Sequence, residues 1–240
     1  MRVLLGSGGF RTPERIAFLT EQMRSFFGAV PRLLFIPHAL RDHDQYAQLI
    51  RERGLNAGYE LDPLHRHPDP RATVREAPAL FIGGGNTFRL LSELYRLDLI
   101  DLIRQRVWQG VPYLGISAGA NVACPTIKTT NDMPITLPPS LEALGLVPFQ
   151  VNPHYFPGHF HFKTDAGFVE HFSETRDERL REFHEMNDTP VVGLWEGGVL
   201  RREGSRLVLG GAPARLFFQG REPRDVAPGA VLDELLTPGG

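Results

Sequence analysis

Short apolar runs alternate with amphipathic stretches over the first half of the chain. Apolar strands are expected at residues 2–5, 32–36, 57–61, 79–82 and 111–116. Amphipathic helices are expected at residues 13–27, 42–53 and 87–106, the last with a break near Asp98, and a further helix is expected to begin at Ser117. Strands that alternate with helices favour a parallel sheet covered by helices on both faces.

The last third of the chain has a different pattern. Four short apolar runs, separated by glycine-rich turns, lie at residues 191–194, 198–201, 206–209 and 214–218. Runs spaced this closely are typical of antiparallel strands. We therefore predict a single α/β domain over residues 1–240, with a three-layer α/β/α architecture, a mostly parallel central sheet and an antiparallel C-terminal extension. Functional sites in such sheets lie at the carboxyl ends of the strands.

Composition and charge narrow the function classes. The net charge is −2 and no basic run occurs, so the electrostatic pattern of a nucleic-acid-binding protein is missing. Cys124 is the only cysteine, so no intramolecular disulfide can form. No apolar run reaches the roughly 18 residues that a membrane span needs, and the N-terminus does not resemble a signal peptide. We expect a cytoplasmic protein without nucleic-acid or membrane partners.

One pentapeptide carries the pattern of a serine nucleophile. Gly115-Ile116-Ser117-Ala118-Gly119 follows an apolar strand and begins a helix. A sharp strand-to-helix turn of this kind lifts the serine hydroxyl clear of the backbone, and small neighbours let the chain pass. The simpler interpretation is a glycine-rich turn with Ser117 as a helix cap. The flanking strand and helix favour the nucleophile.

Two backbone N–H groups are candidates for an oxyanion hole. The first belongs to Ala118, at the helix N-terminus, where the helix dipole also favours negative charge. The second is expected from Gly85, in the segment Gly83-Gly84-Gly85-Asn86 that ends another apolar strand. Glycine lets the backbone approach a ligand closely, although a turn needed only for packing would contain the same residues.

A serine nucleophile needs a base, and the base needs an acid to orient it. Among nine histidines, His154 follows an apolar run in Asn152-Pro153-His154, which puts it at a strand end like Ser117. Two carboxylates are candidates for the acid, namely Asp132, fifteen residues after the serine, and Glu196, at the end of a later apolar run. Sequence order does not choose between them.

At these residues the chain resembles peptidase E, the family of α-aspartyl dipeptidases that remove an N-terminal aspartate from short peptides. The resemblance covers about residues 80 to 210. It rests on the segments Gly83-Gly84-Gly85-Asn86-Thr87-Phe88, Ser117-Ala118-Gly119-Ala120-Asn121, Cys124-Pro125-Thr126-Ile127, Thr129-Thr130-Asn131-Asp132-Met133-Pro134, Asn152-Pro153-His154 and Thr175-Arg176. The run around Asp132 is much more specific than the serine pentapeptide.

The resemblance implies a fold similar to class I glutamine amidotransferases, with serine in place of cysteine. It makes Ser117 the nucleophile and His154 its base, and it implicates both Asp132 and Glu196 as acids. It also implies that Arg176 pairs with the aspartyl carboxylate of the substrate, which suits the bidentate geometry of guanidinium. A homodimer is expected, with the loop after His154 near the partner, and no metal or organic cofactor.

The stretch at residues 155–163 is longer and more aromatic than the family pattern. It borders the predicted specificity site, so this departure bears on the substrate preference rather than on the serine chemistry. His154, His159 and His161 are spaced in a way that also permits a metal site.

Other functions remain open at this point. A cyanophycinase-like peptidase, acting on β-aspartyl bonds, would use the same serine chemistry. Gly6-Ser7-Gly8-Gly9 after the first strand suggests a non-catalytic nucleotide-binding module, although Arg11 stands where that fingerprint needs its third glycine. An amidotransferase would need a cysteine at position 117, and a lipase-like enzyme would need a long apolar lid.

Overall fold

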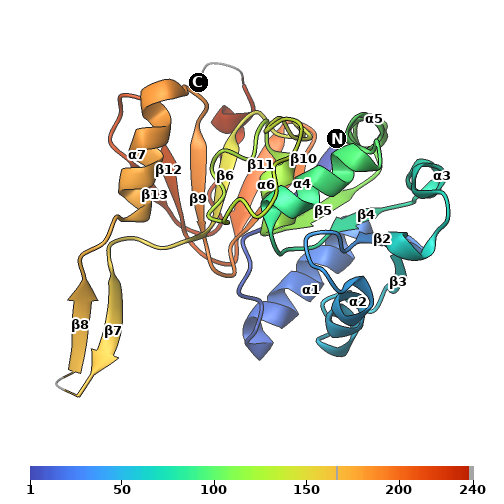
Figure 1. Cartoon of the computed structure of the whole chain (residues 1–240), viewed down its shortest axis with the longest axis horizontal. Helices are drawn as coiled ribbons and strands as arrows, with labels where there is room; N and C mark the ends of the chain where they lie inside the picture. Colours follow the sequence, from blue (N-terminus) through green and yellow to red (C-terminus); the bar gives the residue numbers. More distant parts are fainter. Residues whose placement is uncertain (166, 238–240) are drawn as a thin grey trace.

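A seven-stranded sheet forms the centre of the molecule (Figure 1). The computed structural model describes residues 1–165 and 167–237. The strand order is β11-β10-β1-β5-β4-β2-β3, with β1 (Arg2–Gly6), β2 (Arg32–Ile36), β3 (Glu60–Pro63), β4 (Leu80–Ile82), β5 (Tyr113–Ile116), β10 (Val199–Glu203) and β11 (Arg206–Gly210). Strands β1 to β5 are parallel, whereas β10 and β11 extend the sheet antiparallel.

Helices cover both faces of this sheet. They are α1 (Pro13–Phe27), α2 (His43–Glu52), α3 (Pro70–Glu76), α4 (Thr87–Arg96), α5 (Ile100–Trp108) and α6 (Ala118–Ala123), with short 3₁₀ helices at Leu64–Arg66 and Asp233–Leu236. Successive side chains of β2 point to opposite faces of the sheet and so pack against the two helical layers. Leu33 and Phe35 pack in the cluster with α1 and α2, while Leu34 and Ile36 pack in the cluster with α4 and α5. The predicted three-layer α/β/α class with a mostly parallel sheet is confirmed.

A second, four-stranded sheet corrects one detail of the prediction. Its order is β13-β12-β9-β6, with β6 (Gln150–Tyr155), β9 (Val191–Trp195), β12 (Ala214–Phe217) and β13 (Arg224–Val226). The central sheet is therefore extended by β10 and β11, whereas the runs at 191–194 and 214–218 belong to the second sheet. In that sheet β9 lies parallel to β6 and antiparallel to β12. Apolar residues of α7 (Arg176–Met186) pack onto this sheet.

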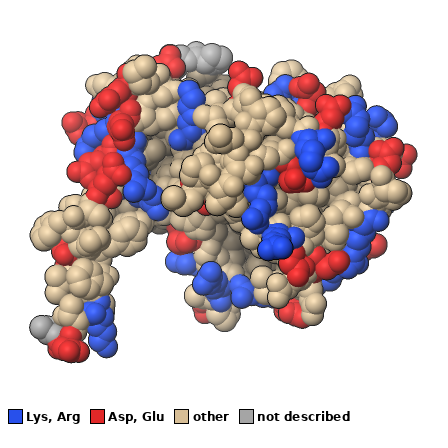
Figure 2. All heavy atoms as spheres, in the orientation of Figure 1, with Lys and Arg blue, Asp and Glu red and all other residues tan. Residues whose placement is uncertain are grey.

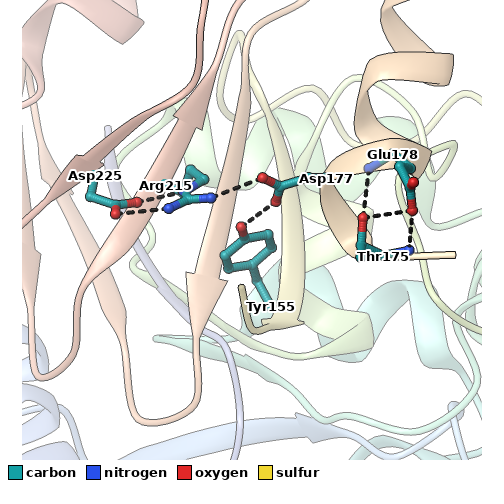
Figure 3. A network of polar contacts seen from close by, with 6 residues as sticks. All are labelled: Tyr155, Thr175, Asp177, Glu178, Arg215 and Asp225. Carbon is teal, nitrogen blue, oxygen red and sulfur yellow. Dashed lines mark hydrogen bonds and ion pairs between the residues drawn. The ribbon is translucent and has the colours of Figure 1, made fainter. Parts of the chain in front are cut away.

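The N-terminus of α7 is fixed to the second sheet by polar contacts (Figure 3). The hydroxyl of Tyr155, in β6, donates to Asp177, and the Arg215 guanidinium pairs with the same carboxylate at 2.8 Å. Thr175 and Glu178 form a reciprocal capping box at the first turn. These contacts hold the start of α7 in a fixed position beside the end of β6.

A two-stranded hairpin extends away from the rest of the chain (Figure 1). It consists of β7 (Phe160–Thr164) and β8 (Gly167–His171) and contains part of the aromatic stretch noted in the sequence. Its surface is mostly uncharged in Figure 2. Large side chains on and beside it are exposed, including Phe168 at 75% and Phe172 at 84%.

The charge pattern of the remaining surface is mixed. Acidic and basic side chains are interspersed over the face in Figure 2. Within residues 1–165 and 167–237, we find no helix with the length and apolar character that crossing a lipid bilayer requires.

Three histidines from separate segments meet at the start of α2. The ring centroids of His38 and His43 are 4.6 Å apart, and those of His43 and His65 are 5.1 Å apart. His38 is buried. Burial, with a smaller contribution from His43, lowers the pKa of His38 from 6.5 to about 4. The imidazole of His38 is therefore neutral in the folded protein at neutral pH.

We expect the protein to lose stability as the pH falls from 6.5 to about 4. In this window the unfolded chain protonates His38 while the fold keeps it neutral, so the unfolded state binds more protons. The free energy of unfolding then decreases as the pH falls, by up to about 3 kcal/mol from this residue. Urea denaturation at a series of pH values measures the slope. His38→Asn should flatten it, and an unchanged slope in that variant would contradict the expectation.

Candidate active site

Ser117 lies on a tight turn between β5 and α6. Its backbone has φ 54° and ψ −108°, a conformation that residues other than glycine rarely adopt. The flanking glycines are needed because the chain passes close to itself. A Cβ on Gly115 would stand 2.2 Å from the carbonyl oxygen of Gly119, and one on Gly119 would stand 2.2 Å from the carbonyl oxygen of Ile82. The pentapeptide thus forms the strained turn that it predicts.

His154 and Glu196 form a hydrogen-bonded chain with Ser117. The Ser117 Oγ is 2.7 Å from His154 Nε2, and His154 Nδ1 is 2.8 Å from Glu196 Oε1. The carboxylate accepts the Nδ1 proton, which leaves Nε2 free to accept the serine proton. The contact with His154 holds the pKa of Glu196 below its usual range, against the effect of burial. This arrangement has the geometry of a nucleophile, a base and an orienting acid.

The backbone around His154 explains how its side chain reaches Ser117. Strand β6 pairs with β9, but the register shifts between Pro153 and Tyr155. His154 lies at this irregularity with φ 55°. Bulges of this kind redirect a side chain out of the regular alternation of a strand.

Asp132 is not part of this chain, although the sequence left it as an equal candidate. Its Oδ2 accepts hydrogen bonds from the Thr87 backbone N–H at 2.8 Å, the Thr87 hydroxyl at 2.6 Å and the Thr130 hydroxyl at 3.2 Å. Among the described residues it makes no hydrogen bond to His154. Asp132 therefore ties its own loop to the start of α4, while still lining the cavity next to Ser117.

The glycine turn after β4 lies against the serine. A Cβ on Gly84 would stand 3.0 Å from the Ser117 Cβ, and both Gly84 and Gly85 line the cavity that contains Ser117. Gly85 has φ 134°, which other residues rarely adopt. Ala118 is the first residue of α6, where backbone N–H groups have no partner within the helix. Of the two residues expected to donate to the oxyanion, Ala118 thus directly follows the nucleophile and Gly85 lines the cavity that contains it.

The glycines after β1 provide space for the histidine and the glutamate. A Cβ on Gly8 would stand 2.4 Å from His154 Cε1, and a Cβ on Gly9 would stand 2.1 Å from Glu196 Oε2. The segment that suggested a nucleotide-binding loop therefore packs directly against this pair of side chains.

Ser7 is a residue of the site that the sequence reasoning missed. Its buried hydroxyl donates to the carbonyl oxygen of Leu194 and accepts from the backbone N–H of His154, each at 2.8 Å. It thereby joins β6, which contains His154, to the end of β9, which Glu196 directly follows. The signal was present as a serine between glycines at the end of β1, the edge where the site was expected.

Arg176 is the first residue of α7. Its guanidinium carbon is 5.8 Å from the ring centroid of Phe156, two residues after the histidine. The Nε is buried and has no hydrogen-bond partner within the described part of the chain. Burial, with a smaller effect of Arg179, lowers the pKa of Arg176. This guanidinium is therefore a partly desolvated cation that is available to an anion.

The structure also bears on two alternatives raised by the sequence, a cysteine nucleophile and a histidine metal site. Cys124 is fully buried, and burial raises the pKa of its thiol to about 12, so it is not an activated nucleophile. His159 Nδ1 lies 2.7 Å from Glu170 on the hairpin. No group of three or more histidine, cysteine, aspartate or glutamate side chains in the described ranges is placed to hold a metal ion.

Comparisons with known proteins agree with the geometry. Residues 3–210 match the family described as Peptidase family S51. The chain is 52% identical to peptidase E of Streptomyces coelicolor, covering 90% of this chain and 86% of the relative. It is 48% identical to a probable alpha-aspartyl dipeptidase of Drosophila melanogaster, covering 86% and 84%.

Solved structures support the fold. The structure of a peptidase from an acI-B1 actinobacterium matches with a TM-score of 0.66 at 20% identity, covering 96% of each chain. A putative peptidase E of Listeria monocytogenes matches with a TM-score of 0.63, covering 88% of this chain and 98% of the other. The resemblance found in the sequence is thereby confirmed, and the chain belongs to peptidase family S51.

Proposed function

We propose that this protein is a serine dipeptidase that hydrolyses the peptide bond after an N-terminal aspartate. The observation that carries the proposal is the hydrogen-bonded chain from Ser117 through His154 to Glu196. It occurs in a chain about half identical to relatives named peptidase E and alpha-aspartyl dipeptidase. The name of the second relative supports the aspartyl substrate.

The reaction follows from the positions of these groups. His154 Nε2 takes the proton of the Ser117 hydroxyl as the oxygen attacks the scissile carbonyl. The N–H groups of Ala118 and Gly85 stabilise the oxyanion. The C–N bond breaks as His154 returns the proton to the leaving amine, which leaves an acyl ester on Ser117. Water then attacks the ester with His154 as base, and the serine is released.

Glu196 rather than Asp132 orients the histidine in this proposal. The 2.8 Å contact to Nδ1 supports it, as does the engagement of Asp132 with Thr87 and Thr130. Arg176 binds the side-chain carboxylate of the substrate aspartate. The support is its unpaired, partly desolvated guanidinium beside Phe156, because low dielectric strengthens an ion pair with an incoming anion.

A dipeptide panel tests the function. We expect turnover of Asp-Leu, with kcat/KM for Asn-Leu lower by about 100-fold, since the partly buried guanidinium of Arg176 loses a charged partner. Arg176→Gln should lower Asp-Leu hydrolysis by a similar factor and narrow the gap to Asn-Leu. Arg179→Gln is the matched control, because Arg179 is exposed and already pairs with Glu174. Preference for the β-linked isomer of Asp-Leu would instead indicate a cyanophycinase-like activity, and equal rates on Asp-Leu and Asn-Leu would contradict the proposal.

We also propose that residues 1–240 act as one domain in a cytoplasmic homodimer, without nucleic-acid partners. The exposed aromatic residues of the hairpin support self-association, because apolar surface of this kind is typically covered in an assembly. A single, buried cysteine suits a reducing compartment. The interspersed charges in Figure 2 differ from the basic surface of a nucleic-acid-binding protein.

A further inference from the structure

A cavity of about 440 Å³ adjoins Ser117 and His154 on the side of α1 and α2. Most of its wall is apolar and comes from both helices and from the central sheet, with Phe10, Leu19, Leu49, Ile50, Phe81 and Ile116. Figure 2 shows a hollow in this face of the molecule beside those helices. The volume is in the range that accommodates a small ligand. No step of the proposed reaction uses this wall.

Two exposed arginines lie at the rim of the cavity. Arg11 follows the glycines that contact His154 and Glu196, and Arg53 follows the C-terminus of α2. Within the described ranges neither guanidinium forms an ion pair, so both charges are open to an incoming anion. The cavity thus has an apolar wall and a cationic rim, which together suit a ligand with an apolar group and an anion.

The position of the cavity decides which part of the substrate fits it. Arg176, proposed for the aspartyl carboxylate, lies on α7 beside Phe156 and does not line the cavity. Ser117 and His154 do line it, so the cavity reaches the reacting groups from a location separate from Arg176. Since the scissile bond must lie at Ser117, one location receives the acyl residue and the other receives the residue that leaves. His154 must also reach the leaving amine, and its side chain lines the cavity.

We infer that this cavity is the binding pocket for the leaving residue, with the apolar wall around its side chain and Arg11 paired with its terminal carboxylate. The inference rests on the proposed function. In a dipeptide only one carbon separates the leaving nitrogen from the carboxylate, so the partner cation must lie close to the catalytic histidine. Arg11 meets this condition, because the glycine two residues before it contacts Glu196. The pocket selects dipeptides with an aliphatic or aromatic C-terminal residue.

Turnover measurements on matched dipeptides test the pocket. We expect kcat/KM to be at least about 10-fold higher for Asp-Leu and Asp-Phe than for Asp-Ala, from burial of the added carbons. Converting Asp-Leu to its C-terminal amide should lower kcat/KM by about 10- to 100-fold, because Arg11 loses a charged partner. Arg11→Gln should lower hydrolysis of the free acid by the same factor, chiefly through KM, and make the acid and the amide nearly equal.

Two further variants distinguish the contribution of the apolar wall from that of the Arg11 charge. Leu49→Gln places a polar group on the wall and should reduce hydrolysis of Asp-Leu more than that of Asp-Ala. Arg41→Gln removes an exposed arginine outside the cavity and should leave the difference between acid and amide intact. Equal kcat/KM for Asp-Leu and Asp-Ala, or an Arg11→Gln variant that still discriminates the acid from the amide, would overturn the inference.

Binding to the Ser117→Ala protein keeps this test independent of turnover. Calorimetry with Asp-Leu, Asp-Ala and Asp-Leu amide should give the same order of affinity. If the wild type hydrolyses none of the aspartyl peptides but this order of binding holds, the proposed function fails and the pocket stands. If the wild type hydrolyses them without preference and binding shows none, the function stands and the pocket is wrong.

Discussion

Replacing Ser117 with alanine is expected to lower kcat for Asp-Leu by at least about 10⁴-fold, since loss of the nucleophile in a serine hydrolase removes the covalent route. The oxygen that lies 2.7 Å from His154 Nε2 disappears, while the histidine and its carboxylate remain. Substrate binding should persist, because neither Arg176 nor the cavity wall is altered. Steady-state kinetics and calorimetry on the same preparation measure both quantities.

The control for this variant is Ser205→Ala, in the exposed turn between β10 and β11. It removes a hydroxyl at the surface and should retain wild-type turnover. Circular dichroism of Ser117→Ala should match the wild type, since the β5–α6 turn keeps its flanking glycines. Turnover within about 10-fold of the wild type would assign the chemistry to another group.

Glu196→Gln is expected to lower kcat by about 10³- to 10⁴-fold, because an amide facing Nδ1 favours the wrong tautomer and does not stabilise the imidazolium. Asp132→Asn should lower kcat by less than about 10-fold, since the amide oxygen can still accept from Thr87 and Thr130. Both variants replace a carboxylate with the corresponding amide. The difference between their kcat values therefore isolates the contact of Glu196 with His154.

The dependence of activity on pH gives a second measurement of the role of Glu196. The contact with His154 holds the pKa of Glu196 below its usual range, so this carboxylate remains ionised throughout the neutral range and through mild acid. Protonation of Glu196 therefore removes activity only when the pH falls below the usual pKa of a glutamate side chain. If Asp132→Asn proved the more damaging substitution, Asp132 rather than Glu196 would be the orienting acid.

The sequence predicted the parallel half of the fold because its signals are local. Apolar runs mark the buried strands, and the break between α4 and α5 occurs at Asp98, where φ is 53°. The second sheet was missed because its pairing is not local. Strand β6 finds its partner β9 some 40 residues later, across the hairpin and α7. No spacing within either strand specifies that partner.

The choice between the two acids depended on the same pairing. His154 lies next to the last residue of β6 and Glu196 follows the end of β9, with Tyr155 opposite Trp195 in these neighbouring parallel strands, so their side chains emerge at one edge of the second sheet. Without the register, Asp132 is closer to the serine in sequence and equally plausible. Ser7 was missed for a related reason, since its hydroxyl bridges β6 and β9 from a third element.

The buried thiol has a practical consequence for spectroscopy. Cys124 is the only cysteine in the sequence, is inaccessible, and stays protonated because burial raises its pKa to about 12. Thiol reagents react with the nucleophilic thiolate form of cysteine, so the native protein offers them almost no target. A cysteine introduced at the exposed His161 would become the single attachment point for a spin label or fluorophore. Distances between labels would then test whether the hairpins meet in the proposed homodimer, with no native cysteine to remove.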